Sequence, residues 1–251
     1  MFNIFRKSLA TGRVTTPYPA QPDTPAAAFR GAPQLAPEFC QQCGACIRAC
    51  PSGALTTEYL DLGFCHFCGR CAEACPHGAI TMSKDFELAV RQRSLLLRQI
   101  PATVSVEEIG AELQRTINRL FGHSMHIRHV DSGSCNGCDW EMVALTGPVY
   151  DLQRFGLDFV ASPRHADCLM VTGCPSLHLV QALEKTYEAA PNPRLVVAVG
   201  TCAISGGMFA DSYAVLGGAD KVVPVDLYIP GCPPRPQALL YGLLKLLNRL
   251  G

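Results

Sequence analysis

The second half of the chain alternates short apolar runs with longer amphipathic stretches. The apolar runs predict five strands, at HIRHVD (126–131), LDFVAS (157–162), CLMVTG (168–173), LVVAVG (195–200) and VDLYI (225–229). Helical patterns follow Cys138 and cover residues 177–188 and 237–250. Strands rich in Val, Ile and Leu that alternate with helices are typical of a parallel sheet covered on both faces. We therefore predict an α/β module over residues 120–251.

A further helical pattern precedes this module. In SVEEIGAELQRTINRLFG the apolar residues recur every three or four positions, at Val106, Ile109, Leu113, Ile117 and Leu120. This spacing predicts an amphipathic helix. Because residues 81–125 also contain no cysteine, we expect a helical linker, assigned to residues 93–119, between two modules.

The first 34 residues are rich in Pro and Ala and are expected to form an extension. At its start, apolar residues alternate with two basic ones, in the order Phe2, Ile4, Phe5, Arg6, Lys7 and Leu9. This pattern predicts a short, basic amphipathic helix. Its apolar side either packs on a partner protein or rests on a membrane surface, and the pattern does not decide between the two.

Residues 40–80 contain a duplicated cysteine segment. CQQCGACIRACPSGALT and CHFCGRCAEACPHGAIT match when they are offset by 25 positions. Each half reads Cys-x2-Cys-Gly-x-Cys-x3-Cys-Pro and ends in a Gly-Ala-hydrophobic-Thr stretch that we predict to be a strand. The repeat indicates an α+β module with pseudo-twofold symmetry over residues 35–92.

Composition narrows the chemistry of these modules. The 21 basic and 21 acidic residues give a formal net charge of zero, whereas a nucleic-acid-binding protein normally carries a basic excess. No apolar run approaches the ~18–20 residues needed to span a bilayer, and the N-terminus lacks the features of a secretory signal. Disulfide-rich proteins are mostly small and secreted. The 14 cysteines are therefore expected to be reduced thiols, most of which bind metal.

Eight cysteines have the spacing of a two-cluster ferredoxin. A Cys-x2-Cys-x2-Cys loop supplies three thiolates to a 4Fe–4S cluster, and the fourth comes from the opposite half of the repeat. The first cluster is expected to bind Cys40, Cys43, Cys46 and Cys75. The second is expected to bind Cys65, Cys68, Cys71 and Cys50. A zinc site needs only four ligands in total, so eight cysteines in this duplicated form favour two clusters.

Further cysteines follow predicted strands of the α/β module. Cys135 and Cys138 form a CNGC segment after the first strand, Cys202 follows LVVAVG, and Cys232 follows VDLYIP. Ligands of open α/β sheets gather at the carboxyl ends of strands, so these positions indicate a third cofactor site. Cys174 also follows a strand and competes for a place in this site.

Several neighbouring residues are expected to have structural roles. Cys168 lies within an apolar run and is interpreted as a small buried apolar residue. Asp139 and Glu141 are expected to stabilise the first turn of the helix after CNGC, with a part in proton movement as the alternative. His66 and His77 lie in the duplicated loops but replace no cysteine, so we expect them beside the sites or on the surface.

A set of motifs gives the chain a family resemblance. VDSGSCNGCDWE, RFGLDFVASPRHADCLMVTG, GTCAISGG, DSYAVLGGADKVVPVDLYIPGCPPRP and ALLYGLLKLL together cover nearly the whole second module. They resemble the small electron-transfer subunit shared by membrane-bound NiFe hydrogenases and respiratory complex I. FRGAPQLAPEFC and the cysteine repeat resemble the ferredoxin-type subunit of the same complexes. The chain looks like a fusion of these two neighbours, of the formate hydrogenlyase and hydrogenase-4 type.

The resemblance implies a flavodoxin-like second module that holds a third 4Fe–4S cluster. The family's ligands map onto Cys135, Cys138, Cys202 and Cys232, and Cys174 has no such role in the family pattern. Complex I has two adjacent cysteines at the first pair, whereas the spaced CNGC form resembles the hydrogenase branch. Electrons would then pass through three clusters to a NiFe centre for proton reduction or hydrogen oxidation. No NiFe ligand set occurs in this chain, so no catalytic residue is assigned to it.

The resemblance also implies partners and a location. The partners are a NiFe large subunit, membrane-arm subunits of an antiporter-like complex, and an electron donor such as a formate dehydrogenase or a ferredoxin; no nucleic acid is expected. The implied location is peripheral, on the cytoplasmic side of the inner membrane. Two alternatives stay open: a complex I-like subunit that passes electrons to quinone, and a non-catalytic iron–sulfur sensor or scaffold.

Overall fold

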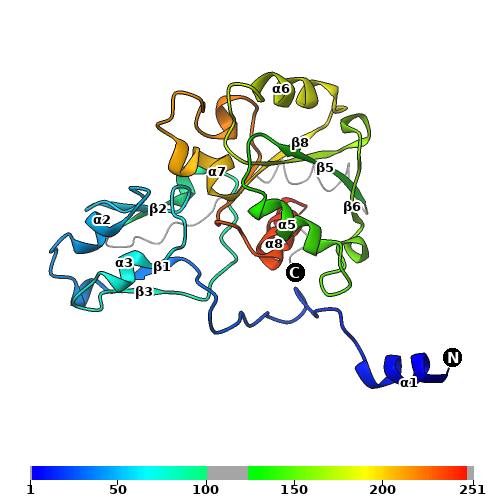
Figure 1. Cartoon of the computed structure of the whole chain (residues 1–251), viewed down its shortest axis with the longest axis horizontal. Coiled ribbons are helices and arrows are strands. Elements are labelled where there is room, and N and C mark those ends of the chain that lie inside the picture. Colours follow the sequence, from blue (N-terminus) through cyan, green and yellow to red (C-terminus); the bar gives the residue numbers. More distant parts are fainter. Residues whose placement is uncertain (1, 101–123, 248–251) are drawn as a thin grey trace.

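The computed structural model describes residues 2–100 and 124–247, and its C-terminal module is built on a five-stranded sheet (Figure 1). The strands are β5 (Met125–Asp131), β6 (Leu157–Phe159), β7 (Cys168–Thr172), β8 (Leu195–Val199) and β9 (Leu227–Ile229). They lie in the order β6-β5-β7-β8-β9, and all neighbouring pairs are parallel. This is the flavodoxin-like order 2-1-3-4-5 of doubly wound folds. The predicted fold class of this module is confirmed.

Helices cover both faces of the sheet. They are α5 (Gly137–Leu145), α6 (Val180–Ala189), α7 (Gly200–Ser205) and α8 (Pro236–Leu246). Successive strand residues point to opposite faces. Met170 therefore belongs to the core formed with α5 and α8, whereas Leu169 and Val171 belong to the core formed with α6 and α7. Short 3-10 turns complete the connections, namely η3 (Leu152–Phe155), η4 (Pro163–His165), η5 (Gly207–Phe209) and η6 (Ala219–Lys221).

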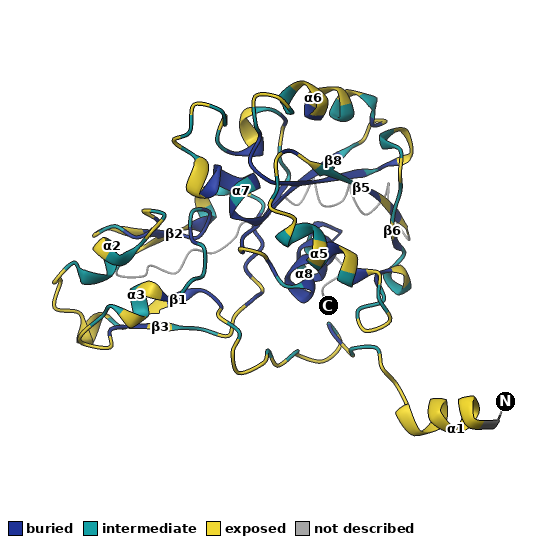
Figure 2. Cartoon of the chain, in the orientation of Figure 1, coloured by how far each residue is buried: buried dark blue, intermediate teal, exposed yellow. Residues whose placement is uncertain are grey.

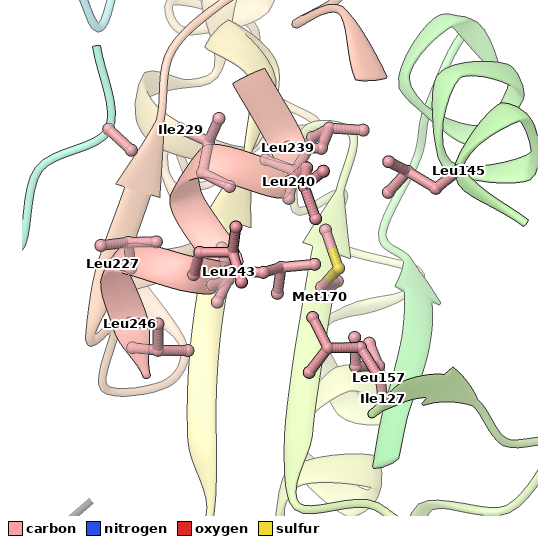
Figure 3. Packing of buried hydrophobic residues seen from close by; sticks show 14 of the residues in the cluster. Ile127, Leu145, Leu157, Met170, Leu227, Ile229, Leu239, Leu240, Leu243 and Leu246 are labelled. Atoms are coloured by element: carbon pink, nitrogen blue, oxygen red, sulfur yellow. The ribbon is translucent and has the colours of Figure 1, made fainter. Parts of the chain in front are cut away.

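Helix α8 packs its leucines onto the sheet. Figure 3 shows Leu239, Leu240 and Leu243 facing strand residues that include Met170 and Ile229. All three leucines are fully buried, and Figure 2 shows α8 as a buried element. Burying a leucine side chain stabilises a fold by about 1.5–3 kcal/mol. The helix thereby holds together the end of the sheet at which β9 lies.

The N-terminal module consists of two small antiparallel strand pairs and two short helices. Strand β1 (Pro33–Leu35) pairs with β3 (Ile80–Met82), and β2 (Tyr59–Asp61) pairs with β4 (Leu97–Gln99). The helices α2 (Ala45–Ala49) and α3 (Arg70–Glu73) each lie in one copy of the repeat and contact each other. Two 3-10 turns, η1 (Pro37–Phe39) and η2 (Arg93–Leu96), flank these elements. The predicted α+β architecture is confirmed.

The start of the predicted linker over residues 93–119 is not helical in the way expected. Residues 93–96 form the 3-10 turn η2, and β4 follows and pairs with β2 in the N-terminal module. The strand is favoured over a continuous helix because its pairing with β2 places Leu95 and Leu96 in the core of the module. The paired strands of the N-terminal module thus lie between residues 33 and 99. The helix predicted over residues 106–120 lies outside the described residues.

The two Gly-Ala stretches of the repeat differ in the structure. Residues 80–82 of the second stretch form β3, as predicted. In the first stretch, residues 53–56 form only an isolated bridge between Leu55 and Leu60. The chain turns back at once, since the backbone N–H of Thr56 donates to the carbonyl of Tyr59 at 2.9 Å. The tight turn leaves no room for a longer strand there.

The two modules share a core and a backbone bridge. Leu62 and Leu96 of the N-terminal module lie in the same buried cluster as Ile204 of α7. Val90 and Tyr228 exchange two backbone hydrogen bonds, of 3.0 and 2.8 Å, at the edge strand β9. The modules are therefore one packed body rather than two domains on a flexible tether.

Helix α7 also holds the second cysteine loop directly. Thr201 Oγ1 donates to the carbonyl of Cys65, and Ser205 Oγ donates to the carbonyl of Gly63, both at 2.8 Å. All of these atoms are buried. Buried hydrogen bonds of this kind fix a loop because leaving either partner unpaired costs about 1–3 kcal/mol.

The N-terminal extension begins with helix α1 (Phe2–Thr11) and then joins the body. The backbone N–H of Thr16 donates to the carbonyl of Val149 at 2.8 Å. Tyr18 is buried, and its hydroxyl donates to Glu87 at 2.8 Å. The short helix expected from the sequence is therefore present. Within residues 2–100 and 124–247, no helix is both long enough and apolar enough to cross a bilayer.

Candidate metal centres

Both copies of the cysteine repeat use the same backbone turn. Gly44 precedes α2 with φ 69°, and Gly69 precedes α3 with φ 81°. A residue with a side chain is strained at such positive φ, which explains the glycine in each copy. Gln42 and Phe67, at matching positions of the two copies, also have positive φ, 53° and 54°. The sequence repeat is thus a repeat of backbone conformation.

The structure brings together the four cysteines predicted for the second cluster. One cavity is lined by Leu55 and Leu60 and by all four thiol residues, Cys50, Cys65, Cys68 and Cys71. Burial, reinforced by the charges of the other three thiols, raises the pKa of Cys65 to about 12. The pKa of Cys71 is raised by burial and by Cys50 and Cys68. Cys50, from the first half of the repeat, therefore lies with the second loop.

The first loop has a matching arrangement. Burial raises the pKa of the Cys46 thiol, and the nearby Cys75 and Cys40 contribute to the increase. Cys75, from the second half of the repeat, therefore lies with the first loop. Cys40 and Cys43 are exposed at this end of the molecule. The two halves thus exchange their last cysteine, which is the arrangement that a two-cluster ferredoxin needs.

The two exchanged cysteines receive hydrogen bonds from the backbone that follows them. The N–H groups of His77 and Ala79 lower the pKa of Cys75, and Ala79 donates to its Sγ at 3.3 Å. Burial raises the pKa of Cys50, but hydrogen bonds from the side chain and backbone of Ser52 outweigh it, so that the net shift is downward. Such donors stabilise a thiolate and tune the potential of a cluster bound to it.

The four cysteines predicted for the third cluster meet at the carboxyl ends of the parallel strands. Cys135 and Cys138 lie between β5 and α5 and in the first turn of α5, Cys202 lies in α7 directly after β8, and Cys232 follows β9. Burial raises the pKa of Cys138, and the charges of Cys202, Cys232 and Cys135 raise it further. Cys232 is exposed as a residue, but partial burial of its thiol, together with the charges of Cys202 and Cys135, raises its pKa to about 11.

Gly200 makes room for this third set. It has φ 81°, and a Cβ atom at this position would lie 2.6 Å from Cys138 Sγ. Any other residue would therefore push the Cys138 thiol away from its partners. In the sequence motif GTC, Gly200 thus allows the Cys138 thiol to approach the backbone, and Cys202, two residues later, is itself a ligand candidate.

Cys174 and Cys168 are both buried, but only Cys174 lies beside the third set. Its thiol donates to the carbonyl of Gly206 at 3.1 Å. A hydrogen bond between the thiols of Cys174 and Cys202, with burial, raises the pKa of Cys202. Cys168 lies inside β7 and is fully buried in the apolar core with α5 and α8, as expected from its sequence context.

Asp139 lies in the first turn of α5, as predicted, but it does not cap the helix. Its carboxylate accepts hydrogen bonds from Ser134 Oγ at 2.7 Å and from Thr172 Oγ1 at 2.9 Å. It also lies 3.1 Å from His129 Nε2. The N-cap residue Asn136 makes no side-chain capping bond. Asp139 therefore ties the CNGC loop to β5 and β7, a role that depends on strands brought together only in the folded sheet.

The second and third cysteine sets are neighbours across the module junction. The charge of Cys68 contributes to the raised pKa of Cys232. His66 Nε2 lies 3.5 Å from the Cβ position of Gly207, which is itself 3.2 Å from Cys202 Sγ. Burial lowers the pKa of His66, which favours its neutral form. The fold therefore leaves little protein between the two sets.

An apolar rim lies on two elements that are next to the third set in the chain, helix α5, which carries Cys138, and the turn η5, which follows α7 with Cys202. It consists of Trp140 and Val143 on α5 and of Met208 and Phe209 on η5, all of them exposed. Trp140 follows Cys138 by two residues, and Met208 follows Gly207, which approaches Cys202. Exposed patches of large apolar residues are typical of surfaces that bind other proteins.

Comparisons with known families agree with this division of the chain. Residues 135–246 match the family described as "NADH ubiquinone oxidoreductase, 20 Kd subunit". Residues 33–56 and 58–81 match the family described as "4Fe-4S binding domain". The two ferredoxin-type matches cover the two copies of the cysteine repeat. The chain therefore contains domains that bind 4Fe–4S clusters.

Individual relatives are components of hydrogenases and of NADH-quinone oxidoreductases. Formate hydrogenlyase subunit 7 of Escherichia coli is 42% identical over 151 residues, 60% of this chain but only 59% of that protein. A probable membrane-bound hydrogenase subunit of Pyrococcus furiosus is 44% identical over 132 residues, 53% of this chain and 79% of that protein. An NADH-quinone oxidoreductase component of Geotalea uraniireducens is 49% identical over 114 residues, 45% of this chain and 66% of that protein.

Proposed function

This chain belongs to the family of the NADH ubiquinone oxidoreductase 20 kDa subunit, an iron–sulfur electron-transfer family that includes hydrogenase subunits, and we propose that it relays electrons through three 4Fe–4S clusters to a NiFe centre on a partner subunit. The proposed reaction of the complex is proton reduction or hydrogen oxidation. The chain itself supplies the path for the electrons and no catalytic residue.

The observation that carries this proposal is the placement of three sets of four thiols along one packed body. Cys40 and Cys43 lie at the exposed end, and the second set shares its module with them. The second and third sets adjoin through Cys68, Cys232 and His66. Because electron transfer between redox centres falls steeply with distance, adjoining sets are what a relay requires.

Each set has the donor chemistry that a 4Fe–4S cluster needs. We assign the ligands as Cys40, Cys43, Cys46 and Cys75, then Cys65, Cys68, Cys71 and Cys50, and lastly Cys135, Cys138, Cys202 and Cys232. A bound cluster supplies one-electron redox chemistry. The chain's residues do the rest: four thiolates hold each cluster, backbone N–H groups donate to Cys50 and Cys75, and Thr201 and Ser205 fix the second set against α7.

The apolar rim is the proposed docking surface for the large subunit. Trp140, Val143, Met208 and Phe209 are exposed beside the third set, and Cys135 and Cys232 are themselves exposed. A partner that covered this rim would exclude water from the third cluster and bring its own centre close to it. Apolar and aromatic side chains of this kind are enriched in the cores of protein interfaces.

The proposed partners and location are supported in part by the named relatives. One of them is described as a membrane-bound hydrogenase subunit and another as a formate hydrogenlyase subunit. These names support a place in a membrane-bound complex. From the resemblance of the sequence, we further propose a peripheral position on the cytoplasmic side of the inner membrane, next to antiporter-like membrane subunits. A formate dehydrogenase or a ferredoxin is the proposed donor, and it would deliver electrons at the exposed first set.

Nickel analysis of the intact complex tests the proposed function. We expect nickel in the large subunit, hydrogen turnover with a viologen dye, and no response to inhibitors of quinone sites. A complex without nickel that reduces quinone would contradict the hydrogenase and leave the clusters in place.

Quinone reduction is the second candidate, because a relative named as an NADH-quinone oxidoreductase component shares 49% identity over 114 residues. The segment Cys135-Asn136-Gly137-Cys138 favours the hydrogenase. Its two cysteines are separated, as in the hydrogenase branch that the sequence resembles, whereas the quinone-reducing branch has two adjacent cysteines at this place. A non-catalytic sensor or scaffold would keep the clusters but would purify without any partner that turns over substrate.

A further inference from the structure

The apolar side of helix α1 is not covered by the described part of the chain. Ile4, Phe5 and Leu9 are 72%, 65% and 84% exposed. Phe5 and Leu9 are four residues apart and therefore lie on one face of the helix. Figure 1 shows α1 standing clear of both modules, and Figure 2 shows it exposed along its length. A helix of 10 residues is marginal in water, so it needs a surface on which to pack.

The same segment is strongly basic. Arg6, Lys7 and Arg13 are exposed, and residues 1–22 contain no Asp or Glu. The first acid, Asp23, pairs with Arg235 at 2.8 Å and does not offset this charge. The surface that receives α1 must therefore offer apolar contact and negative charge together.

The arrangement of these charges favours a lipid surface over a protein. Arg6 and Lys7 follow Phe5 directly in the helix and are each turned about 100° from the residue before, so the cations do not form one edge. Long basic side chains in a membrane interface extend to the headgroups from any side of a helix. Lysine is, by contrast, depleted in the cores of protein interfaces. We propose that α1 lies in the headgroup layer of an anionic phospholipid bilayer, with Phe5 and Leu9 toward the acyl chains.

The attachment of α1 to the body allows this contact to orient the molecule. Gly12 ends the helix with φ 62°. Thr15 Oγ1 then donates to the carbonyl of Pro148 at 3.0 Å, and Thr16 is bonded to Val149. Val14 and Val149 are 51% and 42% exposed beside this junction. A bilayer that binds α1 would therefore also meet the edge of the α/β module at residues 147–149.

Vesicle binding by the full, cluster-loaded chain tests this inference. We expect co-sedimentation with vesicles of phosphatidylcholine mixed with phosphatidylglycerol, little binding to phosphatidylcholine alone, and weaker binding at high salt. The pair Arg6→Gln/Lys7→Gln should lower binding about tenfold or more, since each basic residue near an anionic surface contributes about 1 kcal/mol. Leu9→Ser should lower it by a similar factor.

Matched controls separate α1 from the rest of the surface. Lys185→Gln/Lys221→Gln removes two exposed charges elsewhere, and Leu97→Ser removes a leucine that is 44% exposed on β4. Both controls should bind vesicles like the native chain.

The inference rests on the proposed membrane-bound setting, but its test is independent of electron transfer. All variants should keep their iron and their cluster absorbance, so loss of the clusters is recognised separately from loss of vesicle binding. The proposal is overturned if the full chain does not bind anionic vesicles, or if the α1 variants bind as well as the controls. It is also overturned if Leu9→Ser releases a partner subunit from the intact complex while vesicle binding stays unchanged, because α1 would then dock on protein.

Discussion

At the scale of single residues, Cys174 is the thiol whose role is best defined by its contacts. It is buried, donates to the carbonyl of Gly206 at 3.1 Å, and hydrogen-bonds with the thiol of Cys202. When Cys202 binds iron as a thiolate, it has no proton to donate. We therefore expect the single S–H of Cys174 to turn from the Gly206 carbonyl to the Cys202 sulfur. Cys174 is accordingly expected to position the third cluster rather than to bind it.

Cys174→Ala should therefore keep the third cluster and lower its midpoint potential. A hydrogen bond to a ligand sulfur stabilises the more negative, reduced cluster. Loss of about 1 kcal/mol corresponds to about 40 mV for a one-electron couple. Redox titration followed by electron paramagnetic resonance measures the shift.

Cys174→Ser and Cys202→Ser are the matched comparison. We expect Cys174→Ser to retain all of the iron and a smaller shift, because its hydroxyl still donates, whereas Cys202→Ser loses the third cluster. The opposite pattern would make Cys174 the ligand and would reject the assignment of Cys202.

At the scale of elements, a buried ion pair fixes the loop before the second cysteine set. Arg93 of η2 forms two hydrogen bonds to the carboxylate of Asp61 in β2, at 2.9 and 2.7 Å. Asp61 also accepts the backbone N–H of Gly63 at 2.7 Å. Gly63 is in turn held by Ser205 of α7. The ion pair thus connects η2 and β2, through Gly63 and Ser205, to helix α7, which carries Cys202 of the third set.

Removing the cation should destabilise this region. Arg93→Ala leaves a nearly buried carboxylate without its partner, so we expect a loss of about 2–3 kcal/mol in the free energy of unfolding. Urea unfolding followed by fluorescence and by cluster absorbance measures it. Arg98→Ala, an exposed arginine on the adjacent strand, is the control and should change stability by less than about 0.5 kcal/mol. Equal effects of the two variants would mean that the Asp61 contact contributes little.

The elements that the sequence predicts well are those with a long, regular pattern. The apolar runs of β5, β7 and β8 and the helical patterns of α6 and α8 lie within a few residues of their predicted ranges. Helix α7 is not predicted, because GTCAIS is short and almost wholly buried and so shows no polar face. Strand β4 is not predicted, because its pairing with β2 is non-local.

The site shows the same division between local and non-local information. The cysteine spacing by itself predicts the two loops of the repeat, and the structure brings Cys50 and Cys75 to the opposite halves. The contacts of Cys174 with Cys202 and of Asp139 with His129 depend on the register of β5, β7 and β8. No local pattern carries that register, so these contacts could not be predicted from the sequence.

At the scale of the whole molecule, the exchange of Cys50 and Cys75 links the first two cysteine sets, and the module junction links the second to the third. Electrons that enter at the exposed first set would therefore pass the second set before they reach the apolar rim. The order of the three cysteine sets is a consequence of how the two modules pack.

The exchange predicts which cluster each substitution damages. Cys50→Ala should disturb the cluster held by Cys65, Cys68 and Cys71, and Cys75→Ala should disturb the cluster held by the first loop. Because the second cluster adjoins the third, Cys50→Ala should also remove its magnetic interaction with the third cluster, as seen by electron paramagnetic resonance. Loss confined to the first cluster in Cys50→Ala would reject the exchange.

The iron content of the anaerobically purified chain tests the three-cluster relay most directly. Twelve ligand cysteines in three sets predict about twelve irons and about twelve sulfides per chain, with no zinc. Cys232→Ser, measured in parallel, should leave about eight irons, since it removes a ligand of the third cluster only. A native chain with about eight irons, or one with zinc in the place of the third cluster, would contradict the relay.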